Sequence, residues 1–434
     1  MKKLLSSALY LCGSFLLSAG ATNAQVATPG STGFCGSHAD KLFCLLPDTF
    51  AEANANAFTP LTSSFATQLT QLPLASPASG IIYILDPALK VQVPAGHETY
   101  GPVLTERGDT MGRHKLFLAF TYQHFQFSSL DGISLGNIPI VWNVCNTTGQ
   151  CGAIATQNSV SLHVNQYAIF GTFGLTSRID VSLAVPLNEV GMGVDAYNCY
   201  NKPNPNFPSF PNTCFGPPDP AAPNSFFGFT PPIGKGQAAS GLGDLVARAK
   251  VQVFSGEKFK IAVGTDVRFP TGDSLNFLGS GAWGVRPFAA FSRGGRISPH
   301  VNIAYQWNGD SILAGATIGK DGKLADNFFY NGGLDAAIIP RLTLAADYLG
   351  EYVINQQRLL GITTCAPFSP GAATCTNFPD TTGVIGSFNT VKGSFGIKFK
   401  PVKNLLISGN VLLRFDHNGL RYDPVPLGGI SYTF

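Results

Sequence analysis

The sequence predicts an all-β fold: a transmembrane, antiparallel, up-and-down β-barrel of twelve or fourteen strands, preceded by an N-terminal plug or periplasmic segment. Three observations predict it. Apolar and polar residues alternate over segments of about ten residues. The connections between these segments are alternately short and long. Charged residues make up only 12% of the chain, against roughly 25% in a typical soluble domain.

The first residues predict export. Lys2 and Lys3 precede an apolar run over 4–17, and small residues follow at 19–24. This order is that of a secretory signal peptide covering residues 1–24. No later stretch approaches the roughly 20 apolar residues that a transmembrane helix needs. The exported chain is therefore soluble or crosses the bacterial outer membrane as a closed barrel, and the scarcity of charge favours the barrel.

The cysteines beyond this segment fall into four close pairs. Such pairs in an exported chain predict local disulfides. A metal site would need short Cys-x-x-Cys spacing with nearby His, which the sequence lacks, so we expect no metal and no cofactor. The formal net charge of +3 offers no basic field for nucleic acid. The expected pairs are Cys35 with Cys44, Cys145 with Cys151, Cys199 with Cys214, and Cys365 with Cys375.

The alternation has the period of a strand whose two faces meet different surroundings. In 258–269, Phe259 and Val263 share one face, and Lys260 and Asp266 lie on the other. Such lengths suit a tilted strand in a bilayer, since strands in soluble proteins average about five or six residues. Aromatic residues near the segment ends predict interfacial girdles. The clearest segments are 178–187, 244–253, 258–269, 297–307, 341–352 and 404–416.

The connections predict an orientation. Short periplasmic turns that alternate with long outer loops are typical of outer-membrane barrels. We therefore expect a barrel over 113–434 with both termini in the periplasm. The short turns are near 175–177, 255–258, 293–296, 339–341 and 400–404, and the long loops are near 128–158, 188–240, 270–284, 308–326 and 355–385.

The two ends of the chain carry further expectations. Residues 25–112 have weak periodicity and form either a plug inside the barrel or a periplasmic tail. A hairpin within 81–104 would raise the strand number to fourteen. At the other end, the aromatic residues Tyr432 and Phe434 share one face of the last strand. We expect the outer-membrane insertion machinery to recognise this strand, and we expect lipid to surround the barrel.

The charged and polar residues on the predicted inner face are the candidate lumen-lining or selectivity residues. They either pair across strands and brace the barrel, or line a permeation route. Both signs are mixed, which argues against a dedicated anion or cation filter. The candidates are Arg178, Asp180, Asp244, Arg248, Lys250, Asp266, Arg268, His300, Asn302, Gln306, Asp347, Glu351, Lys398 and Arg414.

An enzyme of this architecture would be an outer-membrane phospholipase, in which a His two residues away activates a Ser. The chain contains no His-x-Ser sequence. We therefore expect no enzymatic activity.

Four short motifs carry a family resemblance. GLGD at 241–244 precedes an alternating strand that ends in FPTGD at 269–273, and RPF at 286–288 and PHVN at 299–302 follow. Together they resemble outer-membrane barrels of the meta-pathway phenol-degradation type, over roughly 165–434. That family is distantly similar to barrels that import fatty acids and toluene.

The resemblance implies a small hydrophobic or aromatic solute. One departure concerns the plug, because those importers carry Asn-Pro-Ala near the N-terminus and this chain has Ser76-Pro77-Ala78. We expect an outer-membrane channel or transporter for passive passage of such molecules. The alternative is a structural or surface-interaction barrel with a filled, non-conducting interior.

Overall fold

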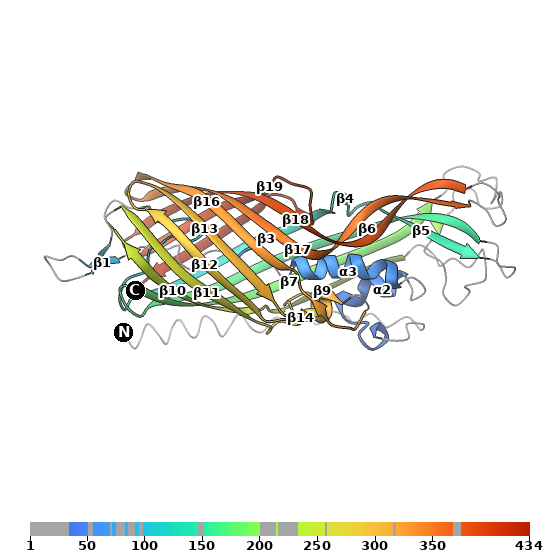
Figure 1. The fold of residues 1–434 in the computed structure, drawn as a ribbon, viewed down its shortest axis with the longest axis horizontal. Coiled ribbons are helices and arrows are strands. Elements are labelled where there is room, and N and C mark those ends of the chain that lie inside the picture. Colours follow the sequence, from blue (N-terminus) through green and yellow to red (C-terminus); the bar gives the residue numbers. More distant parts are fainter. Residues whose placement is uncertain are drawn as a thin grey trace.

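The computed structural model describes residues 34–50, 55–69, 72–74, 83–85, 92–94, 99–145, 151–199, 214–215, 233–256, 258–315, 318–367 and 375–434. The expected signal peptide lies outside the described residues. Most of the described chain is strand, joined in one long, continuous sheet (Figure 1).

The main strands of the described chain form a closed ring of twelve. Each pairs antiparallel with the next, and β21 returns to β3 with Thr433 opposite Phe117. This closure confirms the predicted twelve-stranded barrel. The ring consists of β3 (Leu116–Leu130), β6 (Cys151–Gly174), β7 (Ile179–Cys199), β10 (Leu245–Ser255), β11 (Phe259–Phe269), β12 (Gly284–Arg293), β13 (Ile297–Asn308), β16 (Asp326–Ile339), β17 (Leu342–Pro367), β18 (Cys375–Val402), β19 (Leu405–Arg414) and β21 (Val425–Thr433).

Smaller elements decorate the ring. β9 pairs with β7 beyond the end of β10, and β1 with β2 forms a separate two-stranded sheet. The predicted hairpin therefore exists but adds no strand to the ring. These elements are η1 (Cys35–Ser37), α2 (Leu42–Phe50), α3 (Ala55–Leu69), β1 (Tyr83–Leu85), β2 (Gln92–Pro94), β4 (Ile133–Ser134), β5 (Ile138–Cys145), β8 (Cys214–Phe215), β9 (Ile233–Leu242), η3 (Ser274–Asn276), β14 (Asp310–Ser311), η4 (Ile312–Ala314), β15 (Gly322–Lys323) and β20 (Leu420–Tyr422).

The two ends of the barrel differ, as the connection lengths predict. Short connections after β6, β10, β12, β16 and β18 lie at what we call the turn end, where the C-terminus also lies (Figure 1). The longer connections lie at the opposite, loop end.

Three predicted loops are partly wrong at the loop end, and one of them, 128–158, contains β5 and the first residues of β6. Within 188–240, β7 continues to Cys199, and within 355–385, β17 continues to Pro367 and pairs with β18. These extensions lie beyond the outward-facing apolar band. In the β7 extension the apolar side chains of Val190, Met192 and Val194 point inward and pack in the core inside the loop end, so the pattern differs from that of a strand whose apolar face meets lipid.

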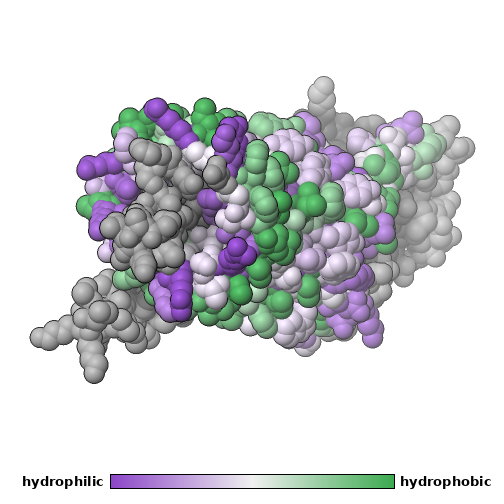
Figure 2. Space-filling model, turned by 60° about the vertical axis from the view of Figure 1, so that its left-hand side comes forward, coloured by the Kyte–Doolittle hydropathy of each residue, from purple (hydrophilic) through white to green (hydrophobic). Residues whose placement is uncertain are grey.

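The predicted apolar faces point outward. Leu118, Val263 and Ile303 are 42%, 42% and 51% exposed, which is unusual for large apolar side chains unless they face lipid. Figure 2 shows apolar side chains on the outer wall and hydrophilic ones gathered at the turn end. No helix among the described residues has the length and apolarity to cross a bilayer.

Exposed aromatic side chains lie toward both ends of the apolar band. Such girdles place ring edges at the two membrane–water interfaces. Toward the turn end they are Phe254, Phe259, Phe291, Phe399 and Phe434, and toward the loop end they are Trp283, Trp307, Phe328, Tyr352 and Phe415.

The largest apolar core lies inside the loop end. Phe43 of α2 and Phe65 of α3 are fully buried in one cluster with Phe125 of β3 and Leu162 of β6. The inner face of the barrel is therefore apolar at this level, because it packs against helices and not against water. Closer to the turn end, the inner face becomes polar.

The facing and the depth can be tested on β13. Ile303→Arg at mid-strand should lower the free energy of unfolding by about 2–4 kcal/mol, whereas Ile297→Arg at the strand end should cost about 0–1 kcal/mol. The cause is transfer of the guanidinium into hydrocarbon at one level and into the interface at the other. Equilibrium denaturant unfolding in lipid vesicles measures both values, and equal losses would contradict the assignment.

Candidate lumen site

Residues 99–112 lie inside the ring at its turn end, and we call them the turn-end insert. Nearly all of them are buried. The Tyr100 hydroxyl donates to Pro340 O at 2.6 Å, and the Met111 amide donates to Asp180 Oδ2 at 2.9 Å. Pro340 lies in the turn after β16 and Asp180 lies in β7, on distant parts of the ring, so the insert extends across the lumen.

Glu106 is the main anionic anchor of the insert. Its carboxylate pairs with Arg248 and, at 3.3 Å, with Lys250. The Asn302 side chain accepts from the Glu106 amide at 2.7 Å and donates to the Glu106 carbonyl at 2.6 Å. This arrangement satisfies both the charge and the backbone of a buried residue, as burial requires.

A second group of buried polar side chains surrounds Thr105. Its Oγ1 donates to Asp347 Oδ1 at 3.1 Å and lies 2.9 Å from His300 Nε2. His300 Nε2 also lies 2.8 Å from Asp347, and its Nδ1 lies 3.5 Å from Asp335. The wall therefore supplies a compact acid–imidazole group against one residue of the insert.

Further contacts hold both ends of the insert. Lys398 Nζ donates to the carbonyls of Tyr100 and Pro102 at 3.2 and 2.6 Å. At the other end, Asp109 pairs with Lys260 at 2.5 Å. All of these contacts are hydrogen bonds or ion pairs. The covalent connection of the insert to the barrel is the chain itself, which continues into β3.

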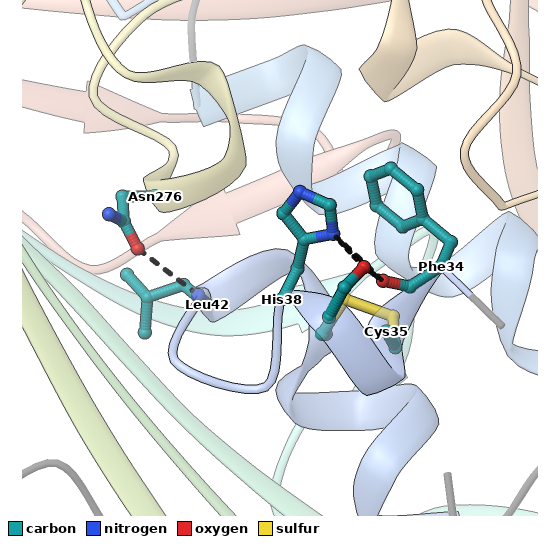
Figure 3. Close-up of a disulfide and its surroundings, with 7 residues drawn as sticks. Phe34, Cys35, His38, Leu42 and Asn276 are labelled. Atoms are coloured by element: carbon teal, nitrogen blue, oxygen red, sulfur yellow. Dashed lines mark hydrogen bonds between the residues drawn. A yellow bond between two sulfur atoms is a disulfide. The ribbon is translucent and has the colours of Figure 1, made fainter. Parts of the chain in front are cut away.

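The other end of the lumen is covered by residues 34–46 and 61–69, the loop-end cap. The Cys35–Cys44 disulfide closes its first turn, as predicted, and the Leu42 amide donates to Asn276 Oδ1 at 3.3 Å (Figure 3). Lys41 Nζ donates to Asp273 at 3.0 Å. This hydrogen bond raises the pKa of the Lys41 ammonium above its ordinary value. The cap is thus cross-linked by an internal disulfide and bound to the loop between β11 and β12.

The other predicted cysteine pairs lie at the loop end. Cys365 and Cys375 form the predicted disulfide across β17 and β18. In the backbone register, Cys145 lies opposite Cys151 and Cys199 lies opposite Cys214. The side chains of these four residues lie outside the described part of the structure, so their two disulfides stay predictions.

A cavity of about 210 Å³ lies between the insert and the cap. Residues 72–74 of the N-terminal chain line it, and Gln123 Nε2 of β3 donates to Pro73 O at 2.6 Å. Its apolar lining includes Leu72, Leu74, Leu104, Phe170, Phe288 and Phe329, and its charged lining consists of Glu106, Arg248, Asp266, Arg268, Arg286, Glu351 and Lys392.

Asp266 organises the charged wall of this cavity. It accepts from Arg248 Nε at 2.5 Å and from Arg286 Nε at 2.9 Å, so two guanidinium groups share one carboxylate. Each guanidinium also lies over a ring, with Arg248 4.8 Å from the centroid of Phe288 and Arg286 5.4 Å from that of Phe329. Cation–π contacts of this kind hold both side chains in place.

The predicted inner-face residues separate into two main groups, and two residues belong to both. The first group contacts the insert, and the second lines the cavity. Contacts to the insert come from Asp180, Arg248, Lys250, His300, Asn302, Asp347 and Lys398, and the cavity lining includes Arg248, Asp266, Arg268, Asn302, Gln306 and Glu351.

Three predicted residues lie elsewhere. Asp244 accepts from the Ser280 amide at 2.7 Å and so holds a loop-end connection, and Arg414 pairs with Asp416 at 2.9 Å. Arg178 does not line the lumen: it is exposed in the turn before β7, which begins at Ile179. The alternation was extended one residue too far, into a turn where the side-chain direction no longer follows the strand period.

The sequence interpretation missed several residues of the site. Glu106 and Asp109 lie in a segment without periodicity, so no face could be assigned to them. Arg286 is next to Pro287, and Lys392 follows a predicted loop. The signal that could have found them is charge complementarity. The inward face carries several cations, and the segment before the first strand supplies acids that can pair with them. Within the described residues, no group of His, Cys, Asp or Glu could hold a metal ion.

These features define an outer-membrane β-barrel with a partly filled lumen: a closed antiparallel ring, an apolar outer band with aromatic girdles, and a polar interior. The profile of the family described as "Putative MetA-pathway of phenol degradation" matches residues 215–359. This match contains all four motifs and confirms the predicted resemblance. No curated protein matches the chain.

Several solved outer-membrane proteins are similar in structure. An outer-membrane channel from Pseudomonas putida F1 is 14% identical, covers 76% of this chain and 99% of its own, and has a TM-score of 0.43. The P. putida toluene transporter TodX is 10% identical over 74% of this chain and 89% of its own, with a TM-score of 0.32. The NanC porin is 8% identical over 73% and 98%, with a TM-score of 0.35.

The shared carboxylate of the cavity wall can be tested by comparison with an exposed one. Asp266→Asn leaves Arg248 and Arg286 without their common buried acid and should lower the free energy of unfolding by about 3–5 kcal/mol. Asp273→Asn removes the partner of Lys41 at the surface and should cost about 0–1 kcal/mol. Both values come from denaturant titration in micelles. If the two variants lowered the free energy of unfolding by similar amounts, Asp266 would not be the buried carboxylate that Arg248 and Arg286 share.

Proposed function

We propose that the protein is a channel or transporter for passive passage of small hydrophobic or aromatic molecules across the outer membrane. The observation that carries the proposal is the cavity inside the barrel, bounded by two segments of the N-terminal chain. A structural barrel would not need an internal cavity with an apolar portion. In this proposal the N-terminal segment acts as a plug whose two ends regulate access.

The size and lining of the cavity support a small ring compound. A buried apolar cavity of roughly 150 Å³ is sufficient for benzene, and this cavity measures about 210 Å³. Phe170, Phe288 and Phe329 contribute ring surface, and Leu72 and Leu104 contribute aliphatic surface. The family description also names phenol degradation, which is consistent with a single-ring solute.

The orientation follows from the connections. Short turns lie in the periplasm and long loops lie outside in barrels of this class, so we place the turn end, with the C-terminus, in the periplasm. The last strand exposes Ile430, Tyr432 and Phe434 to the lipid side. We propose this outward face as the signal that the insertion machinery reads.

Passage requires the insert to move. Its contacts with the wall are hydrogen bonds and ion pairs, and two carboxylates, Glu106 and Asp109, provide the anionic side of those pairs. Replacing both with amides removes the charge attraction but retains the size of the side chains. The insert should then leave the turn end more often.

The second candidate function is a non-conducting barrel with a structural or surface role. The specific observation in its favour is that the insert and the cap both occupy the lumen of the described structure. The two candidates differ in one measurable property, the permeability of the barrel.

Flux through proteoliposomes tests the proposal. The wild-type protein should admit toluene faster than protein-free vesicles, and the double variant Glu106→Gln/Asp109→Asn should also raise the single-channel conductance in planar bilayers. The exposed loop-end variant Asp321→Asn serves as the matched charge control and should behave like the wild type. If neither the wild type nor the double variant admits any solute, the filled-barrel function is correct.

A further inference from the structure

The charged lining of the cavity is unbalanced. The described side chains that line it include four cations, Arg248, Arg268, Arg286 and Lys392, against the three acids Glu106, Asp266 and Glu351. A surplus cation in a largely buried wall is costly unless an anion compensates it. Within the described residues, three of the four cations have a hydrogen-bonded acid, and one does not.

The pairing identifies Arg268. Lys392 pairs with Glu351 at 2.7 Å, and Arg248 pairs with both Glu106 and Asp266. The Arg268 side chain is only 10% exposed, and its Nε has no hydrogen-bond partner among the described residues.

The nearest acid to Arg268 is already engaged elsewhere. Asp244 Oδ2 lies 3.6 Å from Arg268 Nε, which is within the distance of an ion pair but too far for a hydrogen bond. That carboxylate accepts from the amides of Gly272 and Ser280. Arg268 Nη2 donates to the neutral amide oxygen of Asn308 at 2.8 Å. Arg268 therefore carries a buried charge with an unused donor.

Arg286 provides a second cation on the neighbouring strand. It shares Asp266 with Arg248 and uses Nε and Nη2 for that contact. Its side chain is 34% exposed, whereas those of Arg248 and Lys392 are 10% exposed. Arg286 lines the cavity and is the most open of its cations, and its contact with Asp266 uses two of its three nitrogens. Its Nη1 can therefore bind a solute while the ion pair with Asp266 stays intact.

The backbone makes room for Arg268. Gly284 lies opposite Arg268 in the register, and a Cβ at this position would lie 3.2 Å from the Arg268 Cζ. A glycine here leaves space for the guanidinium close to the backbone of β12, the strand that also carries Arg286. The two arginines thus belong to adjacent strands of one wall, in a cavity that Phe288 and Phe329 also line.

We propose that Arg268 and Arg286 form an anion subsite, and that the cavity binds a single-ring aromatic carboxylate with its ring against Phe288 and Phe329. Guanidinium groups bind carboxylates through paired, charge-assisted hydrogen bonds. The volume accommodates one ring and its carboxylate. This inference rests on the proposed transport function and specifies its solute class.

Calorimetric titration of the purified full-length protein in micelles tests the inference, with benzoate, toluene and hexanoate as probes. Benzoate should bind more tightly than toluene or hexanoate. Arg268→Gln and Arg286→Gln should each weaken benzoate binding by about tenfold or more, the equivalent of one hydrogen bond to a charged group. Toluene binding should be unchanged, and Arg268→Lys should retain part of the benzoate affinity.

The matched control is Arg293→Gln, which removes an exposed arginine at the turn end of β12. It should leave all three affinities unchanged. Toluene binding as tight as benzoate binding, with no effect of either arginine variant, would overturn the anion subsite and leave the proposed function standing. Equal affinity for hexanoate and benzoate would overturn the aromatic assignment. If none of the three probes bound and no solute crossed the proteoliposomes, the proposed function itself would be wrong.

Discussion

Closure of the sheet by backbone hydrogen bonds is the constraint on which the rest of the structure depends. Hydrocarbon offers no partner to an amide or a carbonyl, so a sheet in a bilayer can have no open edge. The pairing of β21 with β3 removes that edge. Once the ring is closed, each spanning strand has one face toward lipid and one toward the lumen, and the alternation along the sequence follows.

A closed ring creates a second problem, which is what fills the interior. Here the N-terminal chain fills part of it, with an apolar cap at one end and a charged insert at the other. The difference between the ends has a physical basis: helices cover apolar wall residues at the loop end, whereas acids of the insert neutralise wall cations at the turn end. Between them, Arg268 of the wall has, among the described acids, only a long ion pair, with Asp244 at 3.6 Å.

The sequence was a good guide to the wall and a poor guide to its contents. The period of two assigned both faces of 258–269, because hydrocarbon tolerates few charged side chains. The same period could not distinguish a lumen-lining charge from one that binds an insert, so Lys250 and Lys398 were assigned to a face without a partner. Residues 99–112 belong to the predicted plug or periplasmic segment, but none of their partners could be assigned, because a segment bound through individual polar contacts has no repeating pattern.

The path of the N-terminal chain has a consequence for biogenesis. Residues 34–50 and 55–69 lie at the loop end, 72–74 lie within the lumen, and 99–112 lie at the turn end. The described parts of the N-terminal chain therefore lie at both ends and in the interior of a barrel that later residues form. Two orders of assembly give this arrangement: β21 pairs with β3 after the N-terminal chain is already inside the forming barrel, or the N-terminal chain enters the closed barrel before α2 and α3 fold.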